Sequence, residues 1–527
     1  MRFFNTAGPI NPVDHYNLDP LRRIDLDTLL PLIGQKKYFV LHAPRQTGKT
    51  SCLLALVKFL NGTGRYRCVY ANLEIGQAAR EDVAAAMPAL LNEIAERARL
   101  ILNDPWPASR WPTLLREVGP FGALNSLLTE WSQQDSRPLV LLLDEIDALV
   151  GDTLITVLRQ LRGGYDKRPQ AFPQTVVLCG VRDVRDYRIH STATKEIITG
   201  GSAFNIKARS LRLGNFTAAE MAELYAEHTA ETGQAFTDEA LARAWELSRG
   251  QPWLVNALGY ETCFESSTNR DRTQPITVER LDEAKEALIL RWETHLDQLA
   301  DKLREPRVQR VIAPLLSGED LQDSAGEEDI QYVLDLGLID RTTGEIAIAN
   351  AIYREIIPRQ LTYVQQLDLE AAQKTVWYVR PDGRLDDDKL LAGFQAFFRE
   401  HSEHWLKRFA YQEAGPQLLL QAFLQRIVNG GGRVEREYGL GRGRTDLLVI
   451  WRFPGGVQRI VIELKILHKS LERTLAEGLA QTGEYLDRLG ESAGHLVIFD
   501  RSARSWEEKI YRRTEEYQGR QMTVWGM

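Results

Sequence analysis

The sequence predicts an α/β protein of several domains, and three stretches carry that prediction. The first is an apolar strand at 38–41, followed by a glycine-containing loop and a helix-forming run at 51–60. The second is an apolar run that ends in Asp144 and Glu145, and the third is a pair of strands within 446–466. Strands that alternate with helices form a mostly parallel sheet with helices on both faces. At 527 residues the chain has room for three or four domains.

The composition is that of a globular protein without a large basic surface. Hydrophobic residues make up 44% of the chain, charged residues make up 26%, and the net charge is −7. Residues 361–527 sum to about +1 and the remainder to about −8, so any nucleic-acid surface is expected to be local. Without a long apolar run or a signal-peptide pattern, we expect a cytoplasmic protein with no membrane partner. The four scattered cysteines indicate neither a zinc site nor a disulfide framework.

The loop after the first strand has the composition of a phosphate-binding loop, or P-loop. Its residues are Ala43, Pro44, Arg45, Gln46, Thr47, Gly48, Lys49, Thr50 and Ser51. We predict that all nine hold a nucleotide, because N–H groups at a helix start bind phosphate, a lysine reaches the outer phosphates and a hydroxyl ligates magnesium. A chance match is the alternative, and the flanking strand and helix argue against it. Ala43 replaces the usual first glycine and disfavours positive φ, so the loop is expected to start differently.

A second apolar strand supplies the acids that a nucleotide site needs. Five apolar residues, 139–143, lead directly into Asp144 and Glu145. Ligands of open parallel sheets bind at the carboxyl ends of the strands, which is where the P-loop and these acids fall. We predict that Asp144 holds magnesium together with Thr50, and that Glu145 orients and deprotonates the attacking water.

Three other segments around this sheet are less specific. Arg182, after a strand at 175–179, is predicted to sense the terminal phosphate, with an ion pair to Asp183 or Asp186 as the alternative. Tyr16 either stacks on the nucleotide base or belongs to a surface arm. Residues 103–120 contain four prolines and are expected to be an irregular insertion.

Five strings in this order resemble the AAA-like prokaryotic ATPases related to the STAND and origin-initiator branches: HAPRQTGKTS, LLLDEID, GVRDVRDYR, GSAFNI and RGQPWLVN. The resemblance covers about residues 1–360 and implies ATP as the nucleotide. It also implies an additional-strand P-loop ATPase core at 1–214, a helical lid at 215–290 and a winged helix at 291–360. In STAND-like proteins a proline in the position of Pro252 touches the nucleotide, whereas a simple helix stop would explain the same residue.

The segment from 291 to 395 is expected to join the ATPase to a further domain. Helices at 308–316 and 329–336 precede a short two-stranded wing, and the second helix is poor in basic residues. We therefore expect the winged helix to pack on the ATPase and not to read a major groove. Residues 361–395 are predicted to be a linker with a solvated acidic run at 381–389. Arg185 and Arg188 could act across a boundary between two copies of the chain, and ordinary surface charge explains them equally well.

The hairpin at 446–466 predicts a second chemistry. On its returning strand, Ile460, Ile462, Leu464 and Ile466 share one face, and Val461, Glu463 and Lys465 share the other. Asp446 opens the partner strand, within reach of Glu463 if the register permits. Two carboxylates and a lysine can hold Mg²⁺ or Mn²⁺ and activate water against a phosphodiester. We predict Asp446 and Glu463 as metal ligands and Lys465 as the group that positions water; the alternative is an exposed Glu–Lys pair on a half-buried strand.

This arrangement resembles the PD-(D/E)XK nuclease superfamily and implies a restriction-endonuclease-like α/β domain at 396–527. Thr445 stands in place of the usual proline before Asp446. The resemblance implies that Gln481 and Tyr485, on the following helix, face the phosphate, and that Glu413 is an extra acid of the fold. Three arginines near the site are suited to a phosphate backbone: Arg442, Arg444 and Arg459.

Taken together, the patterns predict an ATPase that controls a metal-dependent nuclease. The predicted cofactors are ATP and Mg²⁺, and the predicted partner is a nucleic acid, DNA before RNA; a homo-oligomer is a further candidate. A role against foreign or mobile DNA rests on family association alone. The alternative is a STAND-like signalling or scaffolding ATPase whose nuclease-fold domain binds DNA or a partner without cutting. A transcriptional regulator that uses the winged helix is a third reading, and the acidic surroundings of that helix count against it.

Overall fold

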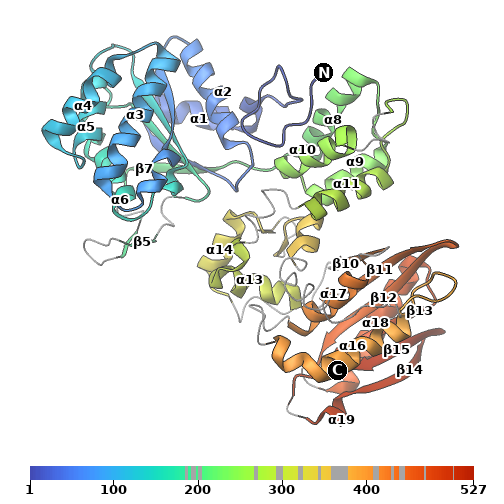
Figure 1. Cartoon of the computed structure of the whole chain (residues 1–527). Coiled ribbons are helices and arrows are strands. Elements are labelled where there is room, and N and C mark those ends of the chain that lie inside the picture. The colour runs from blue at the N-terminus through green and yellow to red at the C-terminus, as the bar shows by residue number, and fades with distance from the viewer. Residues whose placement is uncertain are drawn as a thin grey trace. The chain divides into compact units, whose positions relative to one another are not determined.

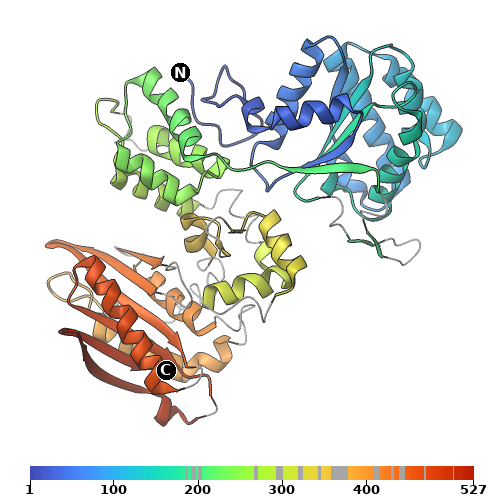
Figure 2. The ribbon, with the colours of Figure 1, turned by 180° about the vertical axis from the view of Figure 1, so that it is seen from behind.

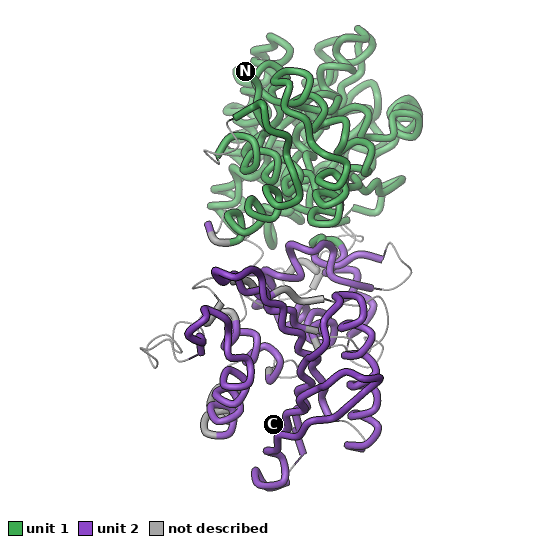
Figure 3. Tube along the Cα trace, turned by 90° about the vertical axis from the view of Figure 1, so that its right-hand side faces the viewer, with its two compact units in different colours: residues 1–290, 335–337 green, residues 291–334, 338–527 purple. Residues whose placement is uncertain are grey.

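The structure is a computed structural model of the whole chain (Figure 1). The residues that it describes are 1–183, 188–190, 197–199, 204–265, 271–291, 301–317, 325–341, 346–357, 378–406, 415–428, 432–437, 446–467, 470–502 and 504–527. They fall into two compact units, shown in different colours in Figure 3. Unit 1 comprises residues 1–290 and 335–337, and unit 2 comprises residues 291–334 and 338–527.

A five-stranded parallel sheet forms the centre of unit 1 (Figures 1 and 2). Its strands are β1 (Tyr38–His42), β2 (Arg67–Asn72), β3 (Leu139–Asp144), β4 (Thr175–Gly180) and β7 (Lys207–Arg212). They lie in the order β2-β3-β4-β1-β7, and every neighbouring pair is parallel. Strand β4 therefore separates the P-loop strand β1 from the acidic strand β3. The predicted α/β core with a parallel sheet is confirmed.

Helices cover both faces of this sheet because its strands are apolar on both sides. Phe39 and Leu41 of β1 pack with α1 (Leu26–Gly34) and α2 (Lys49–Gly62). Tyr38 and Val40 belong to the opposite core, with α3 (Val83–Leu102), α5 (Ala123–Ser132) and α6 (Gly151–Gly163). Alternation along an extended strand sends successive side chains to opposite faces. The shorter elements of this region are η1 (Pro20–Arg23), η2 (Leu73–Ala79), η3 (Ile146–Ala148), η4 (Tyr165–Lys167), β5 (Arg188–His190) and β6 (Ile197–Thr199).

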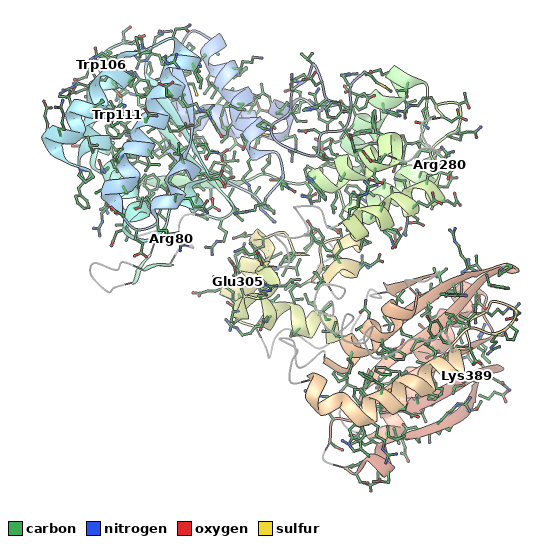
Figure 4. All side chains as sticks on the ribbon, in the orientation of Figure 1. Arg80, Trp106, Trp111, Arg280, Glu305 and Lys389 are labelled. Atoms are coloured by element: carbon green, nitrogen blue, oxygen red, sulfur yellow. The ribbon has the colours of Figure 1, made fainter. Side chains whose placement is uncertain are left out.

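The prediction of an irregular insertion at 103–120 is wrong. Residues Trp106–Val118 form helix α4, and Trp106 and Trp111, labelled in Figure 4, pack against the core beside α3 and α5. Pro107 lies in the first turn, where a missing N–H breaks no helical bond. Pro112 lies farther inside, where it costs roughly 3 kcal/mol that packing must offset. The sequence patterns missed this helix, which packs against the core through Leu114 and its two tryptophans.

The described helices in the rest of unit 1 are α8 (Ala218–Thr232), α9 (Asp238–Ser248), α10 (Pro252–Tyr260) and α11 (Val278–Arg291). A π-turn, η6 (Glu261–Glu265), follows α10 directly. The N-terminal arm, which we define as residues 1–24, is bound to these helices. Arg2 pairs with Glu227 and Glu231 of α8, and the Trp253 indole donates to the Thr6 carbonyl at 3.0 Å.

The next elements are α13 (Pro306–Ser317) and α14 (Glu327–Asp335), followed by the antiparallel pair β8 (Ile339–Asp340) and β9 (Ala347–Ile348) and a helix at 351–357. Glu305, labelled in Figure 4, accepts a hydrogen bond of 2.6 Å from the Tyr332 hydroxyl and pairs with Lys302. This contact ties the start of α13 to α14. Two helices and a two-stranded hairpin occur in the predicted order, and their assignment as a winged helix stays a prediction.

A six-stranded mixed sheet forms the centre of unit 2. Its strands are β10 (Gly432–Glu437), β11 (Asp446–Phe453), β12 (Gly456–Ile466), β13 (Ala493–Phe499), β14 (Tyr511–Tyr517) and β15 (Arg520–Gly526). Their order is β10-β11-β12-β13-β15-β14, with β12-β13 and β13-β15 parallel and the other pairs antiparallel. Helix α18 (Leu471–Leu489) packs on the face that Val461 and Leu496 share. The other helices of this sheet are α16 (Asp387–Leu406), α17 (Gly415–Val428) and α19 (Trp506–Lys509).

The predicted linker at 361–395 is wrong for its second half. Helix α16 already begins at Asp387, and Leu385 is fully buried, with its backbone N–H donating to Gln458 of β12. The Trp451 indole also donates to the Gly383 carbonyl at 2.8 Å. The acidic run at 381–389 is therefore a turn and a helix start, where carboxylates stabilise the helix dipole. Residues 361–377 lie outside the described residues.

Candidate functional sites

The P-loop connects β1 to α2, and its backbone requires a glycine at Gly48 but not at Ala43. Gly48 precedes α2 with φ of +87°, and Gln46 has φ of +56°. Glycine is needed at Gly48 for the backbone conformation, and a Cβ would also lie 2.7 Å from the Arg23 guanidinium, which would have to shift. Ala43 is not among the positive-φ residues of the loop. The missing first glycine therefore places no strain on this loop.

Lys49 lies inside the loop instead of extending into solvent. Its side chain is buried, and Nζ donates to the carbonyls of Ala43 and Pro44 at 3.0 Å each. The Thr47 hydroxyl donates to the Pro44 carbonyl at 2.8 Å. The ammonium group thus lies at the start of α2, beside N–H groups that have no partner within the helix. An anion placed there would meet both.

Thr50 and Asp144 meet at the carboxyl edge of the sheet, as predicted for a metal site. The Thr50 hydroxyl donates to Asp144 Oδ2 at 2.7 Å, and the Tyr70 hydroxyl donates to the same oxygen at 3.2 Å. Asp144 is fully buried. A hydroxyl and a carboxylate are the hard oxygen ligands that Mg²⁺ takes, usually with water and phosphate oxygens completing its shell. These two residues therefore fit a magnesium ion bound together with a nucleotide.

Glu145 follows Asp144 in a left-handed conformation, with φ of +52°. Such a conformation is uncommon for a residue with a side chain and is often found at functional positions. Burial raises the pKa of the Glu145 carboxyl, the nearby Asp147 raises it further, and Lys49 opposes the shift. A carboxylate with a raised pKa is a better proton acceptor, which suits a group that activates water.

Arg182 is half-buried and follows Val181 in the segment after β4, the strand between β1 and β3. Asp183, one of the two alternative partners, forms a buried ion pair with Lys207 of β7. Asp186 and Arg185 lie outside the described residues, and the side chain of Arg188 is not described. The phosphate-sensing role of Arg182 stays a prediction, as does any role of these arginines between copies.

A pocket that is partly open to solvent lies next to the P-loop. Its lining residues come from the N-terminal arm, the P-loop with the first turn of α2, and the start of α10. Pro252 lines the pocket as the first residue of α10, after a break that follows the end of α9 at Ser248. Nucleotide contact by Pro252 stays a prediction, and the helix-stop interpretation stays open beside it.

Tyr16 also lines this pocket, but its ring is part of a buried aromatic cluster. It is fully buried, lies edge-on to His228 with an interplanar angle of 86°, and its hydroxyl is 3.3 Å from His228 Nδ1. The surface-arm alternative is therefore wrong. Stacking of Tyr16 on a base stays a prediction, although much of the ring is occupied by Phe4 and His228.

Arg23 is a residue of this site that the sequence did not reveal. Its guanidinium donates to the Thr47 carbonyl at 2.5 Å and to the Gly214 carbonyl at 2.8 Å, and it lies 4.6 Å from the centre of the Phe216 ring. Arg23 thus joins the P-loop to the segment between β7 and α8. No motif surrounds it in the sequence, so only the packing of the N-terminal arm could identify it.

In unit 2, the register of the hairpin places Asp446 directly opposite Glu463. Side chains of opposed residues share one face, with Cβ atoms about 5 Å apart. Glu463 is 0% exposed, and its Oε1 lies 2.5 Å from Nζ of Lys465, which is 11% exposed. The alternative of an exposed Glu–Lys pair is therefore wrong. The side chain of Asp446 is not described, so its part in a metal site stays a prediction.

The neighbouring residues only partly follow the prediction. Gln481 lies on α18, and its buried Oε1 has no hydrogen-bond partner among the described residues. Tyr485 does not face an open surface, because it packs in the core with Val461. Arg459 is exposed, on the same strand face as Glu463. Glu413, Arg442 and Arg444 lie outside the described residues.

No three His, Cys, Asp or Glu side chains among the described residues cluster as a metal site would require. The Asp446 side chain is not described, so its pairing with Glu463 at a metal ion stays a prediction. None of the described helices is long and apolar enough to cross a bilayer.

No protein-family model and no curated protein matches the sequence. Among solved structures, a Walker-type ATPase of Pyrococcus abyssi is 16% identical with a TM-score of 0.45, covering 67% of this chain and 99% of its own. Cdc6p of Pyrobaculum aerophilum is 17% identical with a TM-score of 0.37, covering 66% and 96%. The RuvB Holliday junction branch migration motor of Thermotoga maritima is 14% identical with a TM-score of 0.33, covering 62% and 91%. Such identities and scores carry no conclusion about activity.

Proposed function

We propose that this protein binds and hydrolyses ATP at the P-loop and that its nucleotide state controls a metal-dependent nuclease in unit 2. The contact between the Thr50 hydroxyl and Asp144 supports the ATPase most directly, because it joins the two magnesium ligands at 2.7 Å. The Lys49 ammonium at the helix start would bind the phosphates, and Glu145, beside Asp144, would act as the base. The nucleotide lies across the carboxyl edge of the sheet, with its phosphates at the start of α2.

The nuclease half of the proposal is supported by the register of Asp446 and Glu463. Two carboxylates on one face of a hairpin can hold a divalent metal ion, which supplies a Lewis acid and an activated water when bound. Lys465 then stabilises negative charge at the phosphate, and the Gln481 amide orients the water or a phosphate oxygen. Arg459 adds positive charge for the nucleic-acid backbone. The substrate is a nucleic-acid phosphodiester, with DNA as the first candidate.

The burial of Glu463 favours one alternative function. A carboxylate that is 0% exposed and pairs with Lys465 of the same strand has its charge balanced without any metal ion. In that case unit 2 binds DNA or a protein partner without cutting, and the chain is a signalling or scaffolding ATPase. The two functions differ in what the loss of Glu463 removes.

A cleavage assay separates these functions. Wild-type protein is incubated with plasmid, linear duplex, single-stranded DNA and RNA, in Mg²⁺ or Mn²⁺, with and without ATP. Glu463→Gln tests the nuclease site, and Glu477→Gln, an exposed acid on α18, is its matched control. Lys49→Ala tests the P-loop, and Lys58→Ala, an exposed lysine on α2, is its control.

We expect Glu463→Gln to abolish cleavage and Lys49→Ala to change its dependence on ATP, while both controls behave as wild type. Cleavage that survives in Glu463→Gln would contradict the proposed nuclease site. ATP turnover without cleavage of any substrate would leave the signalling or scaffolding ATPase as the function. Neither turnover nor ATP binding by the wild type would contradict the ATPase as well.

A further inference from the structure

The pocket beside the P-loop has the walls of a site for a flat aromatic ring. Apolar side chains line it from three directions: Leu18 of the N-terminal arm, Phe216 and Leu224 before and on α8, and Pro252 and Trp253 on α10. Gln46, Gly48 and Ser51 form the side toward the phosphate site. A nucleotide with phosphates at the start of α2 would place its base between these walls. Apolar walls bind any base, so selection among bases needs a polar atom.

Asn256 of α10 supplies such an atom. Its side chain lines the pocket although the residue is only 7% exposed. The amide nitrogen Nδ2 donates to the Pro252 carbonyl at 2.8 Å. Because a carbonyl can only accept, this bond fixes which end of the amide is nitrogen. The other end, Oδ1, is buried and has no hydrogen-bond partner among the described residues.

Three other polar side chains around the pocket already have hydrogen-bond partners. Asn5 donates to the Gly8 carbonyl and accepts from the Ala7 N–H. The Ser51 hydroxyl accepts from the Ile10 N–H, and the Arg23 guanidinium bonds two carbonyls. Buried acceptors in native proteins almost always have a donor. Asn256 Oδ1 therefore lacks a hydrogen-bond donor among the described residues, and a bound ligand can supply one.

We propose that Asn256 determines the base specificity of the nucleotide site by accepting a hydrogen bond from the 6-amino group of adenine. This inference rests on the proposed nucleotide site and adds its base preference. A purine with a 6-oxo group, such as hypoxanthine or guanine, would instead point a carbonyl oxygen at Asn256 Oδ1. Two acceptors face to face leave both without a donor, so the pocket rejects 6-oxo purines. Sites built around a hydrogen bond reject analogues that lack it far better than apolar pockets do.

Equilibrium binding of three triphosphates tests this role: ATP, ITP with a 6-oxo group, and purine riboside triphosphate with hydrogen at the same position. The three share every phosphate and ribose contact. For the wild type we expect ATP to bind roughly ten- to a hundredfold more tightly than ITP, as expected for one buried hydrogen bond. Purine riboside triphosphate is expected between them.

Two variants remove the acceptor in different ways. Asn256→Ala leaves space, and Asn256→Leu keeps most of the volume if the first fails to fold. Both are expected to bring the three affinities within about threefold of one another, mainly by weakening ATP. Gln274→Ala, an exposed amide in the loop before α11, is the matched control and should keep the wild-type order.

The outcomes separate this inference from the proposed function. If wild type binds ATP and ITP equally, and Lys49→Ala abolishes both, the phosphate site stands and the role of Asn256 is overturned. The same holds if the Asn256 variants keep the preference for ATP. If the wild type binds none of the three, the proposed nucleotide site itself fails.

Discussion

The two candidate sites gather their residues in opposite ways. At the P-loop, Thr50 and Asp144 are 94 residues apart and meet because parallel strands bring their carboxyl ends to one edge of a sheet. In unit 2, Asp446 and Glu463 lie on adjacent antiparallel strands and are paired by the register of one hairpin. The first arrangement depends on a whole sheet, whereas the second depends on one turn.

The two sites also differ in how their charges are balanced. Asp144 accepts neutral hydroxyl donors from Thr50 and Tyr70, so a cation can replace the donated protons without breaking an ion pair. Glu463 pairs with the Lys465 ammonium in a buried position, so a metal ion there must compete with a charge that is already present. Metal binding is therefore expected to be easier at the P-loop and more sensitive to substitution at the hairpin.

The largest effect is expected at the P-loop, from Glu145→Gln. Loss of the base should lower ATP turnover about 10²–10⁴-fold and leave ATP binding intact. Because burial raises the pKa of Glu145, wild-type turnover should already fall on acidification at a pH above the usual range of a glutamate. Steady-state turnover over a pH series measures both effects, with Glu96→Gln on α3 as a control. Turnover at the wild-type rate in Glu145→Gln would assign the base to another residue.

Lys465→Met tests the charge balance at the hairpin. Removing the ammonium takes away the ion pair between Lys465 and the buried Glu463 carboxylate, which should destabilise unit 2 by roughly 3–5 kcal/mol. The double variant Glu463→Gln/Lys465→Met should recover most of that loss. Hydrogen exchange of the β12 amides, followed by mass spectrometry, reports on unit 2 alone.

Magnesium then decides what Glu463 does. If it ligates a metal ion, Mg²⁺ should slow exchange in Lys465→Met and have no effect in the double variant. Equal exchange rates with and without Mg²⁺ in Lys465→Met would favour the structural role of Glu463. In that case the two sites would differ in whether they bind a metal ion and not only in how their charges are balanced.

The sequence predicted the parts of both sites that depend on local pattern. The P-loop, Asp144 and Glu145 each follow the end of an apolar run. In a parallel sheet the carboxyl ends of all strands lie at one edge, so the sequence also predicted that these residues share that edge. The opposition of Asp446 and Glu463 was a conditional expectation, since the turn at 454–456 sets the register and the sequence alone did not show which register it allows.

The features that the sequence missed depend on packing between distant segments. Arg23 gains its partners, and Asn256 its place in a pocket wall, only when the N-terminal arm lies against the P-loop and α10. Asn256 in particular stands in an apolar helical run, where an isolated amide gives no pattern. The acidic run at 381–389 was misread for the opposite reason, because its composition matches a linker and only its contact with β12 shows otherwise.

Acid should affect the two units at different pH values. Burial lowers the pKa of His42 to about 4 and also lowers the pKa of His228, both in unit 1. The native state holds these rings neutral while the unfolded chain protonates near pH 6.5, so stability falls as the pH drops below 6.5. The loss is about 1.4 kcal/mol per histidine for each pH unit, until the native pKa is reached.

In unit 2, burial acts to raise the pKa of Asp387, but its hydrogen bond with His495 brings the pKa below its ordinary value. That contribution is present above about pH 3.9, the unfolded value, and is lost as the pH falls through the lower native pKa. Hydrogen exchange at pH 7, 6 and 5 should therefore show unit 1 loosening first. Substituting His228→Gln should reduce the difference, and unit 2 loosening before unit 1 would contradict this assignment.

The smallest effect compares one motif in two settings. Thr217 and Ser505 each form a capping box, with Glu220 and Glu508 respectively, at the starts of α8 and α19. Helix α8 has 15 residues and buries four of them, whereas α19 has four residues and buries none. Thr217→Ala should therefore cost about 1 kcal/mol in the stability of unit 1, and Ser505→Ala only a few tenths in unit 2. Exchange rates of the α8 and α19 amides measure both. Equal effects would mean that the cap itself, and not the buried helix behind it, determines the cost in stability. A larger effect at Thr217 would show that unit 1 needs α8 to be formed up to its first residue.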